Sequence, residues 1–453
     1  MPEYDVVVVG AGTAGCYAAA TAANAGVDVC VLERKPPEEA GRKACGDALK
    51  GASALPESIP TDRIEPAITN TAVDHGRFEL PEANTTLEIP VPGELAVLDR
   101  FAWGRRLIDA ATDAGAEIVY NAVVTDVRQD GQRVTGVIAQ QDGEPTEYTA
   151  DVVIDASGAL SILQERADLT ETTFESGVDI RGFCSAYREV FELDEPVDYD
   201  DALVFKPTER AAGYVWYFPR TPTEINAGIG FQMTEDPIEL AEALHRDIAT
   251  RPEFADATIK NKLGAAVPTR RPYDSAVAPG FLAVGDAAGH VNPTTGGGIA
   301  GAAYAGTYAA ETAVDALSNG GPTEDALWTY NTRVMDHFGA RYAALDIYNL
   351  LTTAVDPDEL TQLLAALPGE RIADSLYSGS ASFGPLLAIE AAIKSFGHWG
   401  LLYRLYQTKQ RADDIMAHYE SYPSSPDGLP AWRRRRDDLL EAAYETTGAD
   451  PKY

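Results

Sequence analysis

Cysteine and long apolar runs are scarce in this chain. Its four cysteines, Cys16, Cys30, Cys45 and Cys184, show no metal-ligand spacing and form no iron–sulfur motif. No uninterrupted run of about 18 apolar residues occurs, and no signal peptide precedes the first predicted strand. We therefore expect no bound metal and no membrane-spanning helix. We expect a cytoplasmic protein, with peripheral contact at the inner face of the cell membrane as the alternative.

Positive charge is also in short supply. Lys and Arg total 36 against 70 Asp and Glu, which gives a formal net charge of −34. This charge argues against nucleic-acid binding, because phosphate neutralisation needs concentrated cations. The acidic residues are spread along the chain, which indicates adaptation to high salt, where screening relieves their repulsion. The alternative is an acidic partner-binding surface, although no single patch dominates.

The first 34 residues carry a complete dinucleotide-binding unit. They predict a buried strand, a glycine-rich turn, an alanine-rich helix and a second strand. Gly10 allows the tight turn, Gly12 lets the backbone approach a pyrophosphate, and Gly15 lets helix and strand pack closely. The helix N-terminus offers free N–H groups to that pyrophosphate. Glu33, at the end of the second strand, is placed to accept hydrogen bonds from ribose hydroxyls.

Two later segments favour a flavin over a nicotinamide. Residues 150–158 (ADVVIDASG) predict a buried strand that ends near Asp155 and Gly158. Residues 280–314 predict a strand, a loop with Asp286 and consecutive glycines, and a long helix of small residues. Asp286 suits the ribityl hydroxyls of a flavin, and the glycine loop brings backbone amides near the isoalloxazine ring. The alternative role for Asp286 is a helix N-cap.

A helix predicted over 99–115 belongs to the same unit. Arg100 at its start is a candidate cofactor contact, with a structural ion pair as the alternative. The residues expected to bind FAD are Gly10, Gly12, Ala14, Gly15, Glu33, Arg34, Cys45, Arg100, Asp155, Gly158, Asp286, Gly297, Gly298 and Ile299.

These segments predict a discontinuous architecture of the α/β plus antiparallel-sheet class. At 453 residues the chain is long enough for two or three structural units. Alternating strand patterns predict an antiparallel sheet that covers the flavin as a substrate domain, and helical periodicity follows it. The expected units are a Rossmann-like FAD-binding domain (1–70, 97–165 and 275–330), a substrate domain (71–96 and 166–274) and a mainly helical C-terminal region (331–453).

Several motifs together resemble the geranylgeranyl reductases, flavoproteins of the p-hydroxybenzoate hydroxylase fold. They are the glycine fingerprint, KACGDALKG (43–51), Tyr214-x-Trp216-x-Phe218-Pro219 followed by Gly228-x-Gly230, VPTRRP (267–272) and GDAAGHVNPTTGGG (285–298). The resemblance is closest to the archaeal branch that saturates the chains of ether lipids, and it extends to the tail segment 422–435. It implies that reduced FAD reduces carbon–carbon double bonds in geranylgeranyl chains of lipid precursors or prenyl diphosphates. It also places the family's active-site cysteine at Cys45.

The expected substrate sets a chemical requirement. An isolated double bond has no carbonyl to polarise, so a hydride from flavin N5 must be matched by a proton on the other carbon. Cys45 is the candidate catalytic donor, because a thiol with a pKa of about 8.5 is mostly protonated at neutral pH. Alternatively, Cys45 shields or orients the ring and ordered water is the donor. Asp47 either tunes this thiol or caps a following helix.

Candidate substrate contacts lie on one predicted strand. Tyr214, Trp216 and Phe218 alternate along it, so their rings share one face. That face is a candidate lining for an apolar channel, with ordinary sheet core as the alternative.

An anionic lipid head group needs cations from this acidic protein. The available cations are Arg188, Lys206, Arg270 and Arg271, with structural ion pairs as the alternative. A predicted helix over 395–407 carries Phe396, Trp399, Leu402, Tyr403 and Tyr406 and lies either on a membrane surface or in the core. The RRRR run at 433–436 either touches anionic lipid or is solvated.

Rival functions share parts of this pattern. A flavin monooxygenase or halogenase has the same fold, and a membrane-surface quinone oxidoreductase or a non-enzymatic flavin protein are further alternatives. The aromatic strand and the Cys-Gly-Asp segment argue against a monooxygenase or halogenase. The lack of a cysteine cluster argues against a quinone oxidoreductase. The electron donor stays open between ferredoxin, reduced flavin and NAD(P)H, since no second glycine fingerprint occurs.

Overall fold

In the computed structural model, the first strand of the chain, β1 (Glu3–Val9), lies inside a mixed sheet, between β11 (Glu144–Asp155) and β2 (Val29–Leu32). The structure describes residues 2–51, 54–91, 93–141, 143–176, 179–208, 212–233, 239–366 and 399–453. The sheet runs in the order β17 (Val277–Ala278), β18 (Phe281–Ala283), β11 (Glu144–Asp155), β1 (Glu3–Val9), β2 (Val29–Leu32) and β8 (Glu117–Val119), and β10 (Arg133–Gln141) and β9 (Val123–Asp130) extend it from β11. β1 pairs in parallel with β2 and β11, so its carboxyl end and theirs meet at one edge.

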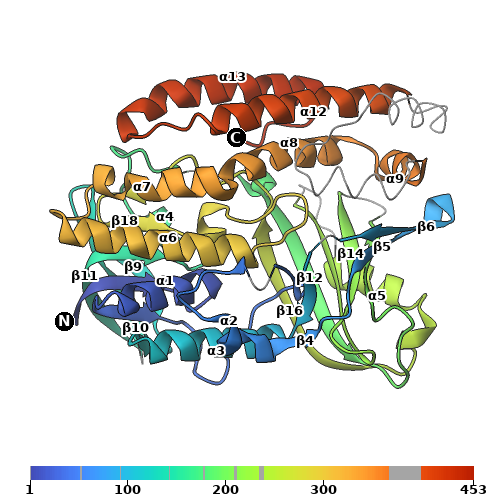
Figure 1. The fold of residues 1–453 in the computed structure, drawn as a ribbon, viewed down its shortest axis with the longest axis horizontal. Helices are drawn as coiled ribbons and strands as arrows, with labels where there is room; N and C mark the ends of the chain where they lie inside the picture. The colour runs from blue at the N-terminus through green and yellow to red at the C-terminus, as the bar shows by residue number, and fades with distance from the viewer. Residues whose placement is uncertain are drawn as a thin grey trace.

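The strands of this sheet are buried on both faces, because helices cover it. α1 (Thr13–Asn24) packs against α6 (Ile299–Ser318), and Figure 1 shows them side by side. Their approach is close, because a side-chain carbon at Gly306 would lie 2.1 Å from the Ala14 carbonyl oxygen. α3 (Arg100–Asp113) begins after Asp99, whose carboxylate accepts from the N–H groups of its first turn. The helix predicted over 99–115 is therefore present, with Asp99 as its cap.

The second sheet is largely antiparallel. Its order is β16 (Thr258–Pro268), β12 (Phe183–Glu192), β15 (Glu224–Gln232), β14 (Gly213–Pro219), β13 (Ala202–Pro207), β5 (His75–Leu80) and β6 (Thr85–Pro90). One face, with Val215 and Tyr217, packs against α5 (Leu240–Ile248). The opposite face, with Trp216 and Phe218, lies against a small sheet of β3 (Ala48–Lys50), β7 (Leu95–Leu98) and β4 (Ile68–Asn70).

Helices follow the two sheets along the chain. They are α7 (Glu324–Val334), the π-helical turn η7 (Met335–Gly339), α8 (Ala340–Ala354), α9 (Pro357–Ala366), α12 (Trp399–Tyr419) and α13 (Leu429–Thr447). Figure 1 shows α12 and α13 as an outer layer over α7 and α8. Short elements complete the description: α2 (Thr61–Ile64), η2 (Glu65–Ala67), η3 (Pro81–Ala83), α4 (Ile162–Arg166), η4 (Ile180–Gly182), η5 (Pro252–Phe254), η6 (Gly285–Ala288) and η8 (Pro426–Gly428).

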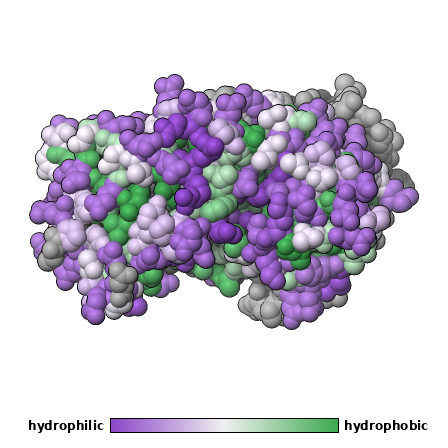
Figure 2. Space-filling view, turned by 90° about the horizontal axis from the view of Figure 1, so that it is seen from below, coloured by the Kyte–Doolittle hydropathy of each residue, from purple (hydrophilic) through white to green (hydrophobic). Residues whose placement is uncertain are grey.

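The predicted fold class is confirmed: a Rossmann-like sheet, an antiparallel sheet and a helical C-terminal region. The exact domain limits stay a prediction. Phe396, predicted on the helix over 395–407, lies outside the described residues. Across the described ranges, no helix is both long and apolar enough to cross a bilayer. Figure 2 shows hydrophilic side chains over most of the face seen from below, as the acidic composition leads us to expect.

Candidate active site

The glycine-rich turn between β1 and α1 leaves one flank open. Gly10 adopts φ +103°, and a side-chain carbon at Gly15 would lie 1.9 Å from the Gly10 carbonyl oxygen. These two glycines are therefore required by the chain's own packing. At Gly12, by contrast, a side-chain carbon would meet no atom of the described chain within 4 Å. Gly12 also precedes α1 as its N-cap, so the helix N-terminus faces this open flank.

Glu33 lies directly beside that turn. Its buried carboxylate accepts from the Ala11 N–H at 3.0 Å and from the Lys35 N–H at 2.9 Å. The glutamate therefore fixes the glycine turn to the end of β2, where the sequence predicts a ribose contact. Arg34, the next residue, is exposed.

Arg100 has a buried N–H donor that no group of the described residues accepts from. The residue is 3% exposed, and its Nη2 donates to the Thr13 hydroxyl at 3.0 Å. Nη1 is buried without a partner, and no carboxylate within the described ranges forms an ion pair with it. A buried donor left unpaired costs about 1–3 kcal/mol, so an acceptor is expected here. The site fits the diphosphate of a dinucleotide beside the first turn of α1, and the ion-pair alternative for Arg100 finds no support.

Asp155 is already saturated by its own loop. Oδ1 accepts from the N–H and hydroxyl of Ser157, and Oδ2 accepts from Ser161 and Gln164. Both oxygens are therefore occupied, so the carboxylate organises the loop that carries Gly158, which adopts φ +100°. A direct cofactor contact by Asp155 stays a prediction.

Asp286 lies in η6, between the first-sheet strand β18 and the glycine loop. Its carboxylate lies 3.0 Å from the Lys43 ammonium group. It is also close to the start of α6, because a side-chain carbon at Gly298 would lie 3.6 Å from Oδ1. The N-cap of α6 is Gly298 and that of η6 is Val284, so Asp286 caps neither helix. Gly297, Gly298 and Ile299 form the turn into α6 on the same side.

His290 holds this Asp286 turn in place, and the sequence analysis missed it. Its Nδ1 accepts from the Gly285 N–H at 3.2 Å, and its backbone N–H donates to the Gly285 carbonyl at 3.0 Å. Burial lowers the pKa of His290 to about 3, so the ring is neutral and Nδ1 is free to accept. The signal was available in the sequence, since a polar aromatic residue follows Gly285 by five positions.

Cys45 lies in the loop that leads into β3. Its thiol is partly buried, and Sγ accepts from the Asp47 N–H at 3.3 Å. Burial, followed by the nearby Asp47 carboxylate, raises the pKa of Cys45, so the thiol is protonated at neutral pH. Asp47 pairs with Arg220 at 2.6 Å. The cap alternative for Asp47 is wrong, because the strand β3 begins at Ala48.

The aromatic residues of β14 share a face, and the cysteine loop lies on it. Neighbouring ring centroids are 5.9 Å apart for Tyr214 and Trp216 and 6.2 Å apart for Trp216 and Phe218. A side-chain carbon at Gly46 would lie 3.0 Å from the Phe218 ring. Trp216 and Phe218 are buried in this packing, whereas Tyr214 is partly buried and donates to the Thr295 carbonyl at 2.8 Å. Tyr214 thus links β14 to the glycine loop.

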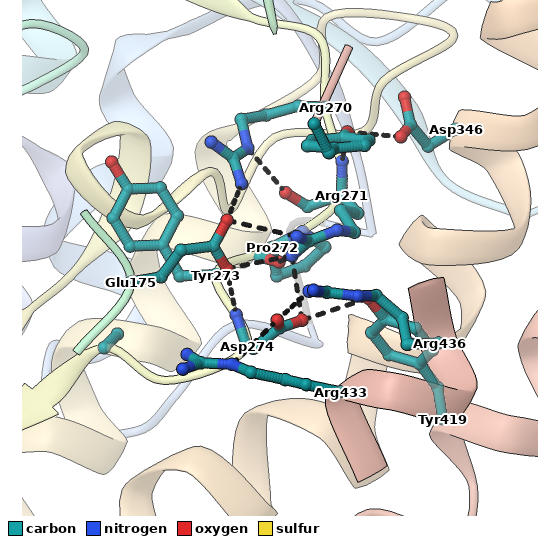
Figure 3. Close-up of polar contacts among 12 residues, drawn as sticks. Glu175, Arg270, Arg271, Pro272, Tyr273, Asp274, Asp346, Tyr419, Arg433 and Arg436 are labelled. Carbon is teal, nitrogen blue, oxygen red and sulfur yellow. Dashed lines mark hydrogen bonds and ion pairs between the residues drawn. The ribbon is translucent and has the colours of Figure 1, made fainter. Parts of the chain in front are cut away.

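The cations proposed for a head group are mostly neutralised. Figure 3 shows Glu175 between Arg270 and Arg271; both arginines are buried, and each forms an ion pair with the Glu175 carboxylate. The Asp274 carboxylate forms ion pairs with Arg271, Arg433 and Arg436. The structural alternative therefore holds for Arg270 and Arg271. Arg433 and Arg436, from the run expected either to touch lipid or to be solvated, instead form ion pairs with Asp274.

The two remaining head-group candidates are Lys206 and Arg188. Lys206 pairs with Asp247. Arg188 is buried, donates to Asn261 and the Lys43 carbonyl, and has an Nε without a partner among the described residues. In the described part of the chain, no three His, Cys, Asp or Glu side chains are grouped to hold a metal ion.

The dinucleotide turn, the Asp286 turn and the antiparallel sheet together define the class of protein, an FAD-dependent flavoprotein. A family profile described as "FAD binding domain" matches residues 3–339. The chain is 32% identical to digeranylgeranylglycerophospholipid reductase 2 of Methanopyrus kandleri, over 82% of this chain and 92% of the relative. It is 27% identical to the enzyme of the same name from Sulfolobus acidocaldarius, over 97% of each chain. The chain belongs to the digeranylgeranylglycerophospholipid reductase family.

Solved structures support the fold. A geranylgeranyl bacteriochlorophyll reductase-like protein from Thermoplasma acidophilum superposes with a TM-score of 0.74 at 24% identity, over 92% of this chain and all of that chain (100%). A flavin-dependent brominase superposes with a TM-score of 0.65 at 16% identity, over 90% of this chain and 99% of its own. At these identities the likeness concerns architecture alone.

Proposed function

We propose that this chain is an FAD-dependent reductase of carbon–carbon double bonds in the geranylgeranyl chains of isoprenoid membrane-lipid precursors. The observation that carries the proposal is the packing of the Cys45 loop on the aromatic face of β14, with Gly46 against Phe218. Family membership supports it, because the curated relatives are named for this activity. In this assignment the first sheet holds FAD and the antiparallel sheet faces the prenyl chain.

Gly12, Glu33 and Arg100 would hold the diphosphate and ribose end of FAD, and Asp286 would hold its ribityl chain. Reduced FAD supplies the hydride that such a reduction needs. The glycine loop at 296–298 and the N-terminus of α6 would lie against the ring. Tyr214, which contacts that loop through Thr295, would then stand where prenyl chain and cofactor meet.

Cys45 would supply the matching proton. Its Sγ–H bond breaks as a C–H bond forms at the carbon that does not receive hydride, and solvent reprotonates the thiolate. Burial keeps this proton on sulfur at neutral pH, as an acid requires. The alternative role, orientation of the ring with water as donor, predicts residual turnover in a variant that lacks the thiol.

Peripheral contact with the inner face of the membrane is part of the proposal. Trp399, Tyr403 and Tyr406 lie at helical spacing on α12 and are 55%, 63% and 53% exposed. Aromatic side chains of this kind favour the lipid–water interface. Replacement of all three by Ser should reduce co-sedimentation with anionic ether-lipid vesicles. Replacement of the exposed strand residues Val123 and Ile259 by Ser is the matched control and should leave binding unchanged.

The activity is tested anaerobically. Dithionite-reduced holoprotein in high salt is mixed with a digeranylgeranylglycerophospholipid, and products are read by mass spectrometry while flavin is followed by absorbance. Stepwise gain of hydrogen pairs with flavin reoxidation is the expected result. If the flavin stays reduced until oxygen is admitted, and oxygen then enters the product, a monooxygenase replaces the reductase. The electron donor is found by replacing dithionite with ferredoxin, reduced flavin or NAD(P)H.

A further inference from the structure

Asn226 in β15 joins the aromatic strand to the cysteine loop. Its side chain is fully buried, and its Oδ1 accepts from the Trp216 indole N–H at 3.0 Å. Its Nδ2 donates to the Cys45 carbonyl at 2.8 Å and to the Asp47 carboxylate. The orientation of this amide is dictated by its partners, since an indole N–H can only donate and the other two groups only accept here.

Asp47 fixes the far end of the same loop. It adopts φ +71°, a left-handed conformation that is costly for a residue other than glycine. The Arg220 guanidinium compensates: its Nε donates to the Asp47 carboxylate at 2.8 Å, and its Nη2 lies 2.6 Å from the same carboxylate in an ion pair. In this conformation the Asp47 N–H reaches Cys45 Sγ, and the Asp47 carbonyl accepts from the Leu98 N–H at 3.0 Å.

Asp47 therefore links Asn226 to the sulfur: its carboxylate accepts from Asn226, and its N–H donates to Cys45 Sγ. The asparagine binds the loop at two points, one on each side of Gly46, and the N–H that orients Sγ belongs to the second of them. Trp216, which Asn226 holds from the other side, lies in the aromatic face proposed for the prenyl chain.

We propose that Asn226 is a positioning residue, which holds the Cys45 thiol in a fixed orientation relative to the aromatic face at Trp216. Its effect on turnover rests on the proposed reductase function, whereas its effect on the thiol does not. Loss of Asn226 leaves the Trp216 N–H and the Cys45 carbonyl without this partner. A misplacement of about 1 Å in a proton donor is enough to cost about 100-fold in rate.

The first test measures the thiol itself. The FAD-loaded holoenzyme is alkylated with iodoacetamide across a pH series, and peptide mass mapping separates Cys45 from the other cysteines. Asn226→Leu should alkylate at Cys45 about 5-fold more slowly than wild type at neutral pH, because loss of the hydrogen bond from the Asp47 N–H raises the pKa of the thiol and lowers its thiolate fraction. Asn331→Leu is the matched control, since Asn331 is a buried asparagine on α7 that bonds to the Ala276 N–H and the Ser275 hydroxyl. It should alkylate as wild type does.

The second test separates positioning from stability. Asn226→Leu should lower kcat about 10-fold or more with little change in KM, whereas Asn331→Leu should leave both unchanged. Trp216→Phe, which removes the indole N–H and keeps a ring, is the milder variant if Asn226→Leu fails to fold. It should lower the Cys45 alkylation rate, as Asn226→Leu does, and the two changes combined should be non-additive.

The outcomes are distinct. If Asn226→Leu and Trp216→Phe both alkylate at Cys45 with the wild-type rate and pH profile, the positioning role is overturned. If wild type adds no hydrogen to the lipid, the proposed function fails, and the alkylation series still decides the role of Asn226.

Discussion

The ammonium group of Lys43 lies 3.0 Å from the carboxylate of Asp286, although the two residues are far apart in the sequence. Lys43 stands two positions before Cys45, and Asp286 stands in the turn that precedes the glycine loop. This contact brings the cysteine loop against the predicted flavin-binding turn. It also places a cation beside the Asp286 carboxylate.

Asp286→Ala should lower the fraction of purified protein that carries FAD, because the ribityl hydroxyls lose their acceptor. Flavin absorbance per polypeptide measures this fraction. Lys43→Met is the informative control, since it frees Asp286 without removing it and should leave FAD content near that of wild type. Equal FAD content in Asp286→Ala and wild type would remove this aspartate from the cofactor site.

Arg100→Met should weaken FAD binding by about 10-fold or more, because a charge-assisted hydrogen bond contributes about 1.5–3 kcal/mol. Titration of the apoprotein with FAD, followed by flavin fluorescence, gives the dissociation constant. Arg105→Met on the same helix is the control, since Arg105 donates to the Pro37 carbonyl near the surface. An unchanged dissociation constant in Arg100→Met would mean that its unpaired Nη1 meets no cofactor atom.

Cys45→Ser should retain FAD and lose most turnover, because a serine hydroxyl is a far weaker acid than a thiol. General acid catalysis contributes about 100-fold or more to a rate, which sets the scale of the expected loss. Hydrogen addition to the lipid is read by mass spectrometry. Cys184→Ser serves as the control for a partly buried thiol on β12. Full activity in Cys45→Ser would assign the proton to water.

His290 should make stability depend on pH. Its pKa is about 3 in the folded protein against 6.5 ordinarily, so below pH 6.5 the unfolded chain takes up a proton that the folded chain refuses. The contribution is therefore present above pH 6.5 and is lost as the pH falls toward 3. Relative to His290→Gln, wild type should lose up to about 5 kcal/mol of unfolding free energy over this range. Parallel pH dependences in denaturant titrations of the two proteins would contradict this.

Lys452 should stabilise the fold through its buried ion pair with Asp346 on α8. Lys452 Nζ lies 2.7 Å from the Asp346 carboxylate, and both side chains are buried. Lys452→Met leaves that carboxylate short of its cation and should cost about 3–5 kcal/mol of unfolding free energy. Lys409→Met, which breaks a pair with the exposed Asp413, should cost under about 1 kcal/mol. The double change Lys452→Met with Asp346→Asn should recover part of the loss, and no recovery would argue against an electrostatic origin.

Local features of the site were predictable from the sequence. The strand, turn and helix around Gly10, Gly12 and Gly15 follow from backbone restrictions and short-range periodicity, which act within a few residues. The shared face of Tyr214, Trp216 and Phe218 follows from the alternation of side chains along a strand, and the ring contacts confirm it.

Other features depend on which distant groups meet. The sequence offered Arg270 and Arg271 for a head group, but Glu175 and Asp274 neutralise them in the folded chain. The sequence around Asn226 does not predict that its side chain will bind the Cys45 loop. The sequence shows which donors and acceptors an arginine or asparagine side chain offers. Which group it binds depends on how the chain packs.

The sequence by itself therefore determined the fold class, the expected cofactor, FAD, and the candidate for the reactive thiol, because local motifs predict all three. The tertiary structure decided which cations are neutralised, how Asp286 and His290 form one turn, and how Asn226 holds the loop of Cys45. These relationships arise from buried polar groups that must find partners on leaving water, and that requirement is met only when segments distant in sequence pack together.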